Sequence, residues 1–245
     1  MMILDHAFFI ALAVVYPIAS YISFQRLLRR IAAGATVGPT ELYRSTAIGH
    51  WAFFAVALAI WFGSGRPWPA LGFGLDITTG FLIGLVLTVG AIVLLVHQYG
   101  AIDGADEKTR ESLLRQLGDL KILMPRTNKE LGQFYAVSAT AGIVEETLWR
   151  GFMFWYLGHV MPLWAVAIAS AVIFGLGHSY QGPKNVPMVT LVGGVFAGLY
   201  ILTGSVWLPM VLHAVFDAVQ GRAAYRVLSR KTTRRAAPAD ESPSP

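Results

Sequence analysis

The stretch Ala141-Gly142-Ile143-Val144-Glu145-Glu146-Thr147-Leu148-Trp149-Arg150-Gly151-Phe152 places three ionisable side chains inside an otherwise apolar run. The whole run, residues 131–157, is long enough to cross a bilayer as a helix, for which about 20 residues suffice. Ionised side chains in hydrocarbon cost much free energy, so a chain that keeps them there generally uses them. The stretch therefore predicts a transmembrane helix that carries a functional polar site.

The composition of the chain also points to a membrane. Hydrophobic residues make up 55% and charged residues 13% of the 245 residues, and the mean hydropathy is +0.56. Soluble domains carry roughly 25% charged residues. The net charge of +5 does not indicate a nucleic-acid partner, because the basic residues lie in loops between apolar runs, which suits an anionic membrane surface. The lack of cysteine excludes disulfides, thiolate nucleophiles and Cys-ligated zinc.

Seven apolar segments are long enough, or nearly so, to span a bilayer. We therefore predict an all-α, polytopic membrane helix bundle of about seven transmembrane helices, or eight if one span is missed. With the N-terminus outside, every basic residue except Arg66 and Arg150 falls in a cytoplasmic loop or in the C-terminal tail. The positive-inside rule therefore predicts an N-out/C-in orientation. The segments are 5–25, 47–63, 78–97, 131–157, 162–178, 187–203 and 205–220.

The chain divides into three regions. Residues 1–126 form an N-terminal three-span region, in which 103–123 is expected to be an amphipathic helix on the cytoplasmic face. Residues 127–220 form a helix core that contains the glutamate pair and starts with a T-x-x-E capping box, Thr127 and Glu130. Residues 221–245 form a basic, Pro/Ser-rich tail that is expected to be disordered in the cytoplasm. Within the sixth span, the small residues Gly194 and Gly198, with Gly193 and Ala197 beside them, are expected to allow close helix packing.

The two glutamates have different expected partners. Glu146 and Arg150 are four residues apart with the acid first, the favoured order for a salt bridge along a helix. Glu145 has no cation nearby in sequence, so it should face water, a histidine or a metal.

Two histidines in later spans can supply that partner. His178 ends the fifth span, and His213 lies in the seventh, where Asp217 shares its helix face. Such a set provides the base, acid and oxyanion donors for water activation, and it also matches a metal site. A lone intramembrane histidine can instead be a helix–helix hydrogen bond. The remaining histidines lie at span ends or in loops and are interpreted as interfacial or solvated: His6, His50, His97 and His159.

Three motifs in this order resemble the signature of the CPBP (CAAX protease and bacteriocin-processing, or Abi) intramembrane protease family. They are Glu145-Glu146-x-x-x-Arg150, Phe174-x-x-x-His178 and His213-x-x-x-Asp217. The resemblance covers about 127–220 and implies a helix bundle in which a glutamate-activated water hydrolyses a peptide bond. It implies a membrane-associated substrate, either CAAX-like or a peptide toxin.

The resemblance also implies roles for single residues. Glu145 would be the general base, His178 would share in activating the water, and His213 would stabilise the oxyanion. Glu146 and Arg150 would hold the first helix in place. Asp217 would orient His213, because an ionised carboxylate would itself repel an oxyanion. No cofactor is expected on this view; zinc held by Glu145, His178 and His213 is the alternative.

Two other function classes stay open. The protein could be a catalytically silent immunity or scaffold protein, although its full set of polar residues argues against lost activity. A transporter that uses the same groups as a proton relay is less favoured. Transporters often carry interrupted helices in both halves, whereas the polar residues of this chain lie in one half. The expected partners are membrane lipid and a membrane-associated peptide or protein substrate, with no nucleic acid, and the expected location is the cell (plasma) membrane.

The depth of Glu145 is a further open point. Glu145 lies roughly 21 Å along an ideal helix from Leu131, at 1.5 Å per residue, whereas His178 should lie near the cytoplasmic end of its span. Either the fourth helix begins outside the hydrocarbon, or residues 175–187 dip into the bilayer beside a cavity.

Overall fold

A computed structural model describes residues 2–100 and 106–236, apart from the side chains of 230–236. Within these ranges the chain is all-α and forms eight helical rods, as the sequence predicts for the fold class. The first rod is continuous from Ile3 to Ala32. The elements are α1 (Ile3–Ile10), the π-helical turn η1 (Ala11–Val15), α2 (Tyr16–Ala32), α3 (Pro39–Gly63), η2 (Trp68–Leu71), α4 (Thr79–Gly100), α5 (Glu107–Leu117) and η4 (Gly118–Ile122).

The second half of the chain contains the four remaining rods. A second continuous rod runs from Asn128 to Leu157 and contains a π-helical turn directly after the glutamate pair. The elements are α6 (Asn128–Glu146), the π-helical turn η5 (Thr147–Phe152), α7 (Met153–Leu157), α8 (Leu163–Gly177), η6 (Ser179–Gln181), α9 (Val186–Thr203) and α10 (Trp207–Ala236).

Four helices of the described chain are long and apolar enough to cross a membrane, and α8 is a shorter apolar helix. Large apolar side chains on these helices face outward; Val86 and Leu94 of α4, for example, are 71% and 65% exposed. Lipid is the solvent that such faces match, so the chain is an integral membrane protein. The four spans are Ile3–Ala32, Pro39–Gly63, Thr79–Gly100 and Val186–Thr203.

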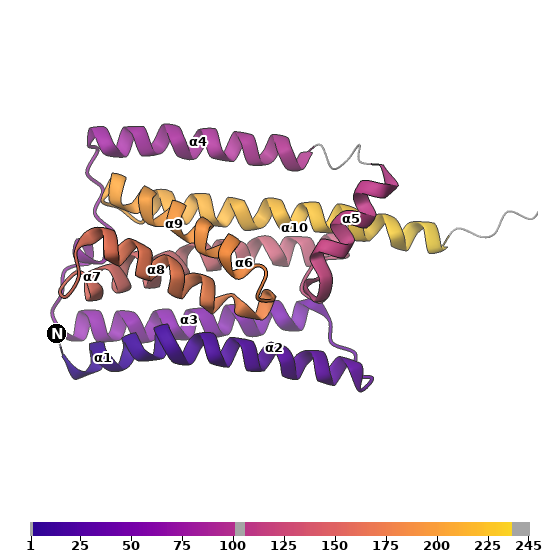
Figure 1. The fold of residues 1–245 in the computed structure, drawn as a ribbon, viewed down its shortest axis with the longest axis horizontal. Helices are drawn as coiled ribbons and strands as arrows, with labels where there is room; N and C mark the ends of the chain where they lie inside the picture. The colour runs from indigo at the N-terminus through magenta and orange to yellow at the C-terminus, as the bar shows by residue number, and fades with distance from the viewer. Residues whose placement is uncertain (1, 101–105, 237–245) are drawn as a thin grey trace, which may run out of the picture.

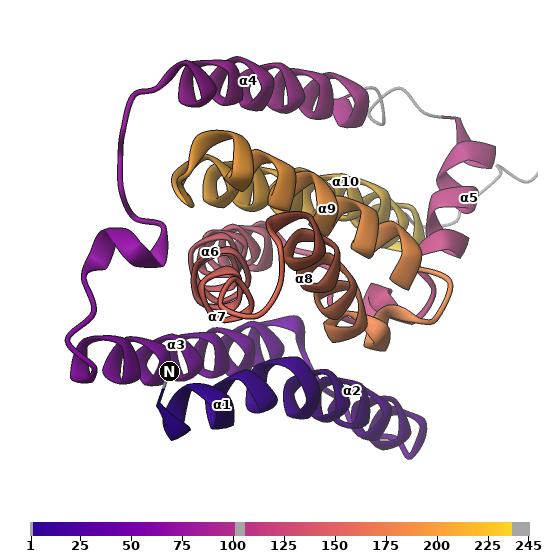
Figure 2. The same ribbon diagram turned by 60° about the vertical axis from the view of Figure 1, so that its left-hand side comes forward.

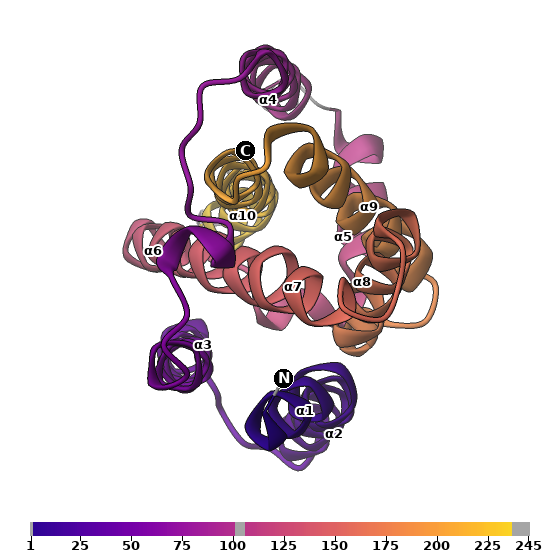
Figure 3. The same ribbon diagram turned by 90° about the vertical axis from the view of Figure 1, so that its left-hand side faces the viewer.

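The rods lie side by side along the long axis of the molecule (Figure 1). An end-on view has α4 on one side, the α1–α2 rod and α3 on the opposite side, and α6 to α10 between them (Figures 2 and 3). The α2–α3 link, α5, the α8–α9 link and the end of α10 all lie at one end of the bundle (Figure 1). The basic residues concentrate in these regions, so they gather at one end of the bundle, as the predicted orientation requires. Which side of the membrane this end faces stays a prediction.

Close contact between α6 and α10 brings the polar motifs together. A Cβ atom on Gly142 would lie 2.6 Å from the Met210 carbonyl oxygen and 3.0 Å from the Ala214 Cβ. Only glycine fits at this approach of two backbones. Glu146 and His213 follow one turn farther along these two helices.

One hydrophobic core joins the N-terminal region to the rest of the chain. Phe8 of α1, Leu12 of η1 and Trp61 of α3 belong to the same buried cluster as Trp149 and Phe152 of η5. Because apolar packing is continuous across these elements, the first two spans are part of the framework that supports the glutamates.

The capping box is confirmed. The backbone N–H of Glu130 donates to Thr127 Oγ1 at 3.2 Å, and the Thr127 N–H donates to Glu130 Oε2 at 3.1 Å. The segment expected to be an amphipathic helix at 103–123 forms α5 and η4, and its first three residues lie outside the described residues.

The C-terminal tail differs from the prediction. A disordered tail from 221 is wrong as far as Ala236, because α10 continues there as a helix. Its inner face is buried at Ala224 and Val227, and Arg110 of α5 donates a hydrogen bond to the Val227 carbonyl at 2.9 Å. The rest of the predicted tail, 237–245, lies outside the described residues.

Two of the four small residues expected to allow close packing on α9, Gly193 and Ala197, are buried, and the other two are not. A Cβ on Gly193 would lie 3.0 Å from Phe174 of α8, whereas a Cβ on Gly194 or Gly198 would meet nothing within 4 Å. The close contact with α8 therefore uses Gly193, and the prediction for Gly194 and Gly198 was wrong.

Candidate active site

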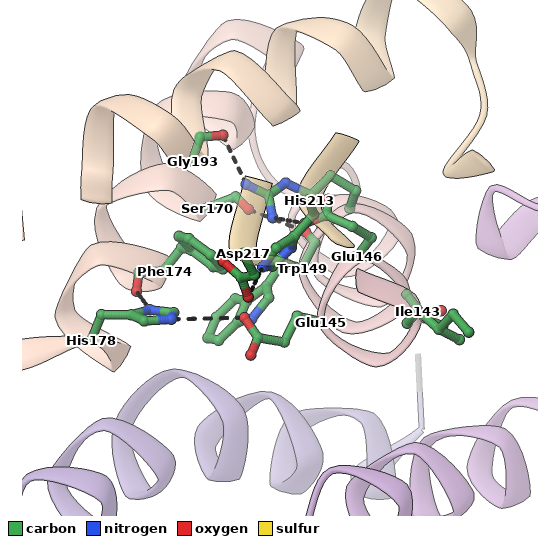
Figure 4. Close-up of polar contacts among 12 residues, drawn as sticks. Ile143, Glu145, Glu146, Trp149, Ser170, Phe174, His178, Gly193, His213 and Asp217 are labelled. Carbon is green, nitrogen blue, oxygen red and sulfur yellow. Dashed lines mark hydrogen bonds and ion pairs between the residues drawn. The ribbon is translucent and has the colours of Figure 1, made fainter. Parts of the chain in front are cut away.

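Glu145 and Glu146 are the last two residues of α6, directly before the π-helical turn η5. Both are buried, with 6% and 0% of their surface exposed. Their side chains point in different directions: Glu146 points between α9 and α10, and Glu145 points toward His178 and the N-terminal helices (Figure 4). The pair therefore serves two separate clusters of polar groups.

The first cluster forms around Glu146. Arg150 Nη1 donates to Glu146 Oε1 at 2.9 Å, so the predicted i,i+4 pair is present. Arg150 Nη2 donates to the Gly193 carbonyl at 2.8 Å, and its guanidinium lies 4.8 Å from the centroid of the Phe174 ring. Arg150 thereby connects η5 to both α8 and α9. The sequence did not predict the second partner of Glu146, which is His213 Nδ1 at 2.7 Å from the same oxygen.

His213 lies between two carboxylates. Its Nδ1 faces Glu146, and its Nε2 lies 3.6 Å from Asp217 Oδ2, which is within ion-pair range but too long for a strong hydrogen bond. Since both neighbours accept hydrogen bonds, a ring protonated on both nitrogens satisfies both contacts. The ring also stacks on Phe196, with centroids 5.1 Å apart.

The second cluster forms around Glu145. His50 Nε2 lies 2.9 Å from Glu145 Oε1, and His178 Nε2 lies 3.9 Å from Glu145 Oε2. This Oε2 atom is buried and has no hydrogen-bond partner among the described residues. The prediction that Glu145 faces a histidine is confirmed, but His50 is a partner that sequence reasoning missed.

The interpretation of His50 as interfacial or solvated is wrong. Its side chain is only 11% exposed, and it projects from the middle of α3 toward Glu145. The sequence carries a signal for this position: Ser45, Thr46, Gly49 and His50 form a polar strip at helical spacing around the start of the second span. All four residues line the same cavity as Glu145.

His178 is held by its own helix. It follows α8 as the C-terminal capping residue, and its Nδ1 lies 2.9 Å from the Phe174 carbonyl oxygen. Because a carbonyl only accepts, the proton of the neutral ring lies on Nδ1. The Nε2 lone pair therefore faces Glu145.

A cavity of about 360 Å³ adjoins Glu145. One side of the wall is apolar, from Leu12 of η1 to Trp149 of η5, and the rest carries hydroxyl groups of α2 and α3. Such a wall can accept both the apolar and the amide parts of a peptide. The lining residues are Leu12, Tyr16, Ala19, Ser20, Ser23, Ser45, Thr46, Gly49, His50, Phe53, Glu145, Leu148 and Trp149.

The zinc alternative does not fit this geometry. No three His, Asp or Glu side chains in the described part of the chain are arranged to hold a metal ion. Glu145 contacts His50 and His178, whereas His213 Nδ1 contacts Glu146, so the three ligands of the zinc alternative do not converge on one point in the described residues.

Comparison with known protein families agrees with the motifs. Residues 127–219 match the family model described as "Type II CAAX prenyl endopeptidase Rce1-like". Residues 127–219 are therefore Rce1-like, and we refer to them as the Rce1-like domain. The predicted resemblance to the CPBP/CAAX protease family is therefore confirmed. No curated protein and no solved structure among those compared matches the chain.

The Rce1-like domain contains the residues of the three motifs but not the whole surroundings of Glu145. His50 and the cavity wall contributed by η1, α2 and α3 lie outside the matched range. The family suggests a CAAX-type endopeptidase, and therefore a protein substrate.

Proposed function

We propose that the protein is an intramembrane endopeptidase that hydrolyses a peptide bond of a membrane-associated substrate, CAAX-like or peptide-toxin-like, with a water activated by Glu145. One observation carries the proposal. Glu145 Oε2 is buried, has no hydrogen-bond partner among the described residues, and faces His178 Nε2 across 3.9 Å beside the cavity. A carboxylate oxygen and an imidazole nitrogen at that separation are suited to hold one water between them.

The first step is attack by this water. A molecule seated off the line between the two atoms contacts each at about 2.8 Å, which is an ordinary hydrogen-bond length. It donates one proton to Glu145 Oε2 and the other to His178 Nε2, so its lone pairs point away from both. Attack on the substrate carbonyl forms the new C–O bond and transfers the water proton to Glu145.

The second step is collapse of the tetrahedral intermediate. His213, held by Glu146 and close to Asp217, would donate its Nε2–H to the oxyanion, while Asp217 orients the ring. Glu145 then returns its proton to the leaving nitrogen as the C–N bond breaks. Glu146 and Arg150 hold the end of α6 against α9 and α10, and no step requires a metal ion.

The membrane arrangement belongs to the same proposal. Seven rods cross the membrane with the N-terminus outside and the C-terminus inside, in the cell (plasma) membrane. The rod α6–α7 has 30 residues and is about 45 Å long, which exceeds the hydrocarbon thickness of about 30 Å. Its first turns can therefore lie in the cytoplasmic interface, which brings Glu145 closer to the level of His178. This favours a helix that begins outside the hydrocarbon.

The test is a comparison of membrane C-terminal peptides in cells that carry the wild-type protein or Glu145→Gln. We expect cleavage products to disappear in the variant, since loss of a general base costs about 10²- to 10⁴-fold in rate. The control is Glu41→Gln, at an exposed position on α3. Equal cleavage by Glu145→Gln and the wild type would eliminate Glu145 as the base, and loss of cleavage on chelation alone would restore the zinc alternative.

A further inference from the structure

The two oxygens of the Glu145 carboxylate have different surroundings. Oε1 is within hydrogen-bond distance of His50 Nε2, at 2.9 Å, whereas Oε2 lies 3.9 Å from His178 Nε2. Among the described residues, Oε2 accepts no hydrogen bond. One oxygen is therefore held, and the other is left for chemistry.

The contact of the second His50 nitrogen limits how protons can be distributed between His50 and Glu145. Its Nδ1 lies 3.0 Å from the Thr46 carbonyl oxygen, one turn back on α3. A carbonyl only accepts, so Nδ1 carries a proton. Nε2 faces a carboxylate oxygen, and this contact is a hydrogen bond only if one proton lies between the two atoms. Either His50 is an imidazolium beside an ionised Glu145, or Glu145 is protonated beside a neutral ring.

Burial and charge favour the ion pair. A carboxylate that is 6% exposed loses most of its hydration and stays ionised only with a cation or several donors beside it. The hydrogen bond from an imidazolium is charge-assisted and therefore stronger than a neutral one. His50 is the cation in direct contact with Glu145.

We propose that His50 is a positioning residue for the catalytic carboxylate: it holds Oε1 through a charged hydrogen bond, keeps Glu145 ionised, and leaves Oε2 free toward His178. The proposal rests on the proposed role of Glu145 as the base. It places one part of the catalytic machinery on α3, outside the Rce1-like domain. His50 itself does not exchange a proton with the substrate.

Other titratable groups also face the pair of His50 and Glu145, and they are the same in the wild type and in the variants compared below. His178 of α8 faces Glu145 at Oε2, and Tyr16 of α2 lines the same cavity. On the far side of α6, His213 interacts electrostatically with both residues of the pair.

The test is His50→Gln. Glutamine keeps a neutral amide donor of similar reach but removes the positive charge. In infrared spectra of the purified full-length protein at neutral pH, we expect His50→Gln to gain one absorption of a protonated carboxyl group, as buried Glu145 takes up a proton. The same absorption should be missing from the wild type and from the double variant His50→Gln/Glu145→Gln, which assigns it to Glu145.

Activity supplies the second readout. We expect kcat of His50→Gln to fall roughly 10- to 100-fold, the usual size of a lost charged hydrogen bond, with KM unchanged. His50→Ala should lose more, because it also removes the donor. The matched control is His159→Gln: His159 is exposed, and its Nδ1 makes the same contact with the carbonyl four residues back, Trp155, at 2.7 Å. It should have the wild-type spectrum and the wild-type kcat.

The outcomes separate the two proposals. No new carboxyl absorption in folded His50→Gln overturns the role of His50, even if Glu145→Gln is inactive. A new absorption together with an active Glu145→Gln supports the pairing and removes the proposed base. If His50→Gln does not fold, nitrogen-15 NMR of histidine in the wild type and in Glu145→Gln answers the same question. A doubly protonated ring that is lost in Glu145→Gln supports the pair, and identical spectra overturn it.

Discussion

Glu146 accepts contacts from two cationic partners with a single oxygen. Arg150 Nη1 and His213 Nδ1 lie 2.9 Å and 2.7 Å from its Oε1, and both Glu146 and Arg150 are fully buried. A buried charge without a partner is far more costly than the same pair left intact. The loss of stability therefore depends on which of these charged side chains is substituted.

Glu146→Gln is expected to destabilise the protein more than Arg150→Met does. The first substitution leaves two buried cations without a carboxylate between them, and a cost of about 3–5 kcal/mol is usual for breaking a buried pair. The second leaves Glu146 with His213 as its counterion. Thermal unfolding in detergent, followed by circular dichroism, gives the two Tm values. A lower Tm for Arg150→Met than for Glu146→Gln contradicts this assignment of charges.

A surface pair on α5 supplies the control. Glu111 and Arg115 have the same i,i+4 spacing, 3.6 Å apart, but more than half of each side chain is exposed. Exposed pairs contribute about 0–1 kcal/mol. Glu111→Gln should therefore change Tm very little.

The candidate site residues could be predicted from the sequence because two local rules identify them. Spacing of four residues pairs Glu146 with Arg150 and His213 with Asp217, and ionisable groups within apolar runs are seldom idle. The contacts between helices could not be predicted in the same way. That His213 meets Glu146 rather than Glu145, and that His50 meets Glu145, depends on how each helix is rotated about its axis.

At the scale of elements, the π-helical turn η5 lies directly beside the glutamate pair and sets the direction of Arg150. It begins directly after Glu146 and contains Arg150. A π-helical turn widens the helix and changes the direction of the side chains that follow, and such turns often lie at functional sites. The sequence marked residues 131–157 as one helical segment, and nothing in its apolar pattern separates a π turn from an ordinary one.

Gly142 provides the test of how α6 and α10 are placed. Gly142→Ala is expected to lower both Tm and activity, because the new Cβ would lie 2.6 Å from the Met210 carbonyl oxygen, which belongs to a helix backbone and cannot move alone. Overpacking of this kind typically costs about 1–3 kcal/mol. Separation of the two helices would also lengthen the contact between Glu146 and His213.

Gly132→Ala is the matched control on the same helix. Gly132 is exposed, and a Cβ there meets nothing within 4 Å. Alanine favours helix over glycine by about 1 kcal/mol, so this variant should be neutral or slightly more stable. Equal behaviour of the two variants would show that α6 and α10 are not in close contact at Gly142.

At the scale of the whole molecule, the region outside the Rce1-like domain is packed into the same structure. Asp5 of α1 is fully buried and accepts two hydrogen bonds from Arg66, at 2.7 and 2.6 Å. The guanidinium of Arg66 lies 4.1 Å from the Trp155 ring of α7, so Arg66 links α1 and the segment after α3 to the domain. The sequence predicted seven apolar segments, but it did not indicate this pairing, since Asp5 and Arg66 are far apart along the chain.

The orientation in the membrane yields the last prediction. The chain contains no cysteine, so single cysteines can be introduced without removing any other. Asp76 lies in the exposed link before α4, and Asp119 lies in the exposed turn η4. The start of α4, which follows this link, and α5, which precedes η4, lie at opposite ends of the bundle (Figure 1). Because the positive-inside rule assigns the basic end to the cytoplasm, we expect a membrane-impermeant maleimide to label Asp76→Cys in intact cells.

Asp119→Cys should react with the same reagent only after the cells are permeabilised. Total labelling after denaturation corrects for expression, and the cysteine-free wild type gives the background. Labelling of Asp119→Cys alone in intact cells would reverse the proposed orientation. Equal labelling of both variants in intact cells would mean that α4 does not cross the membrane. The proposed count of seven spans would then be wrong.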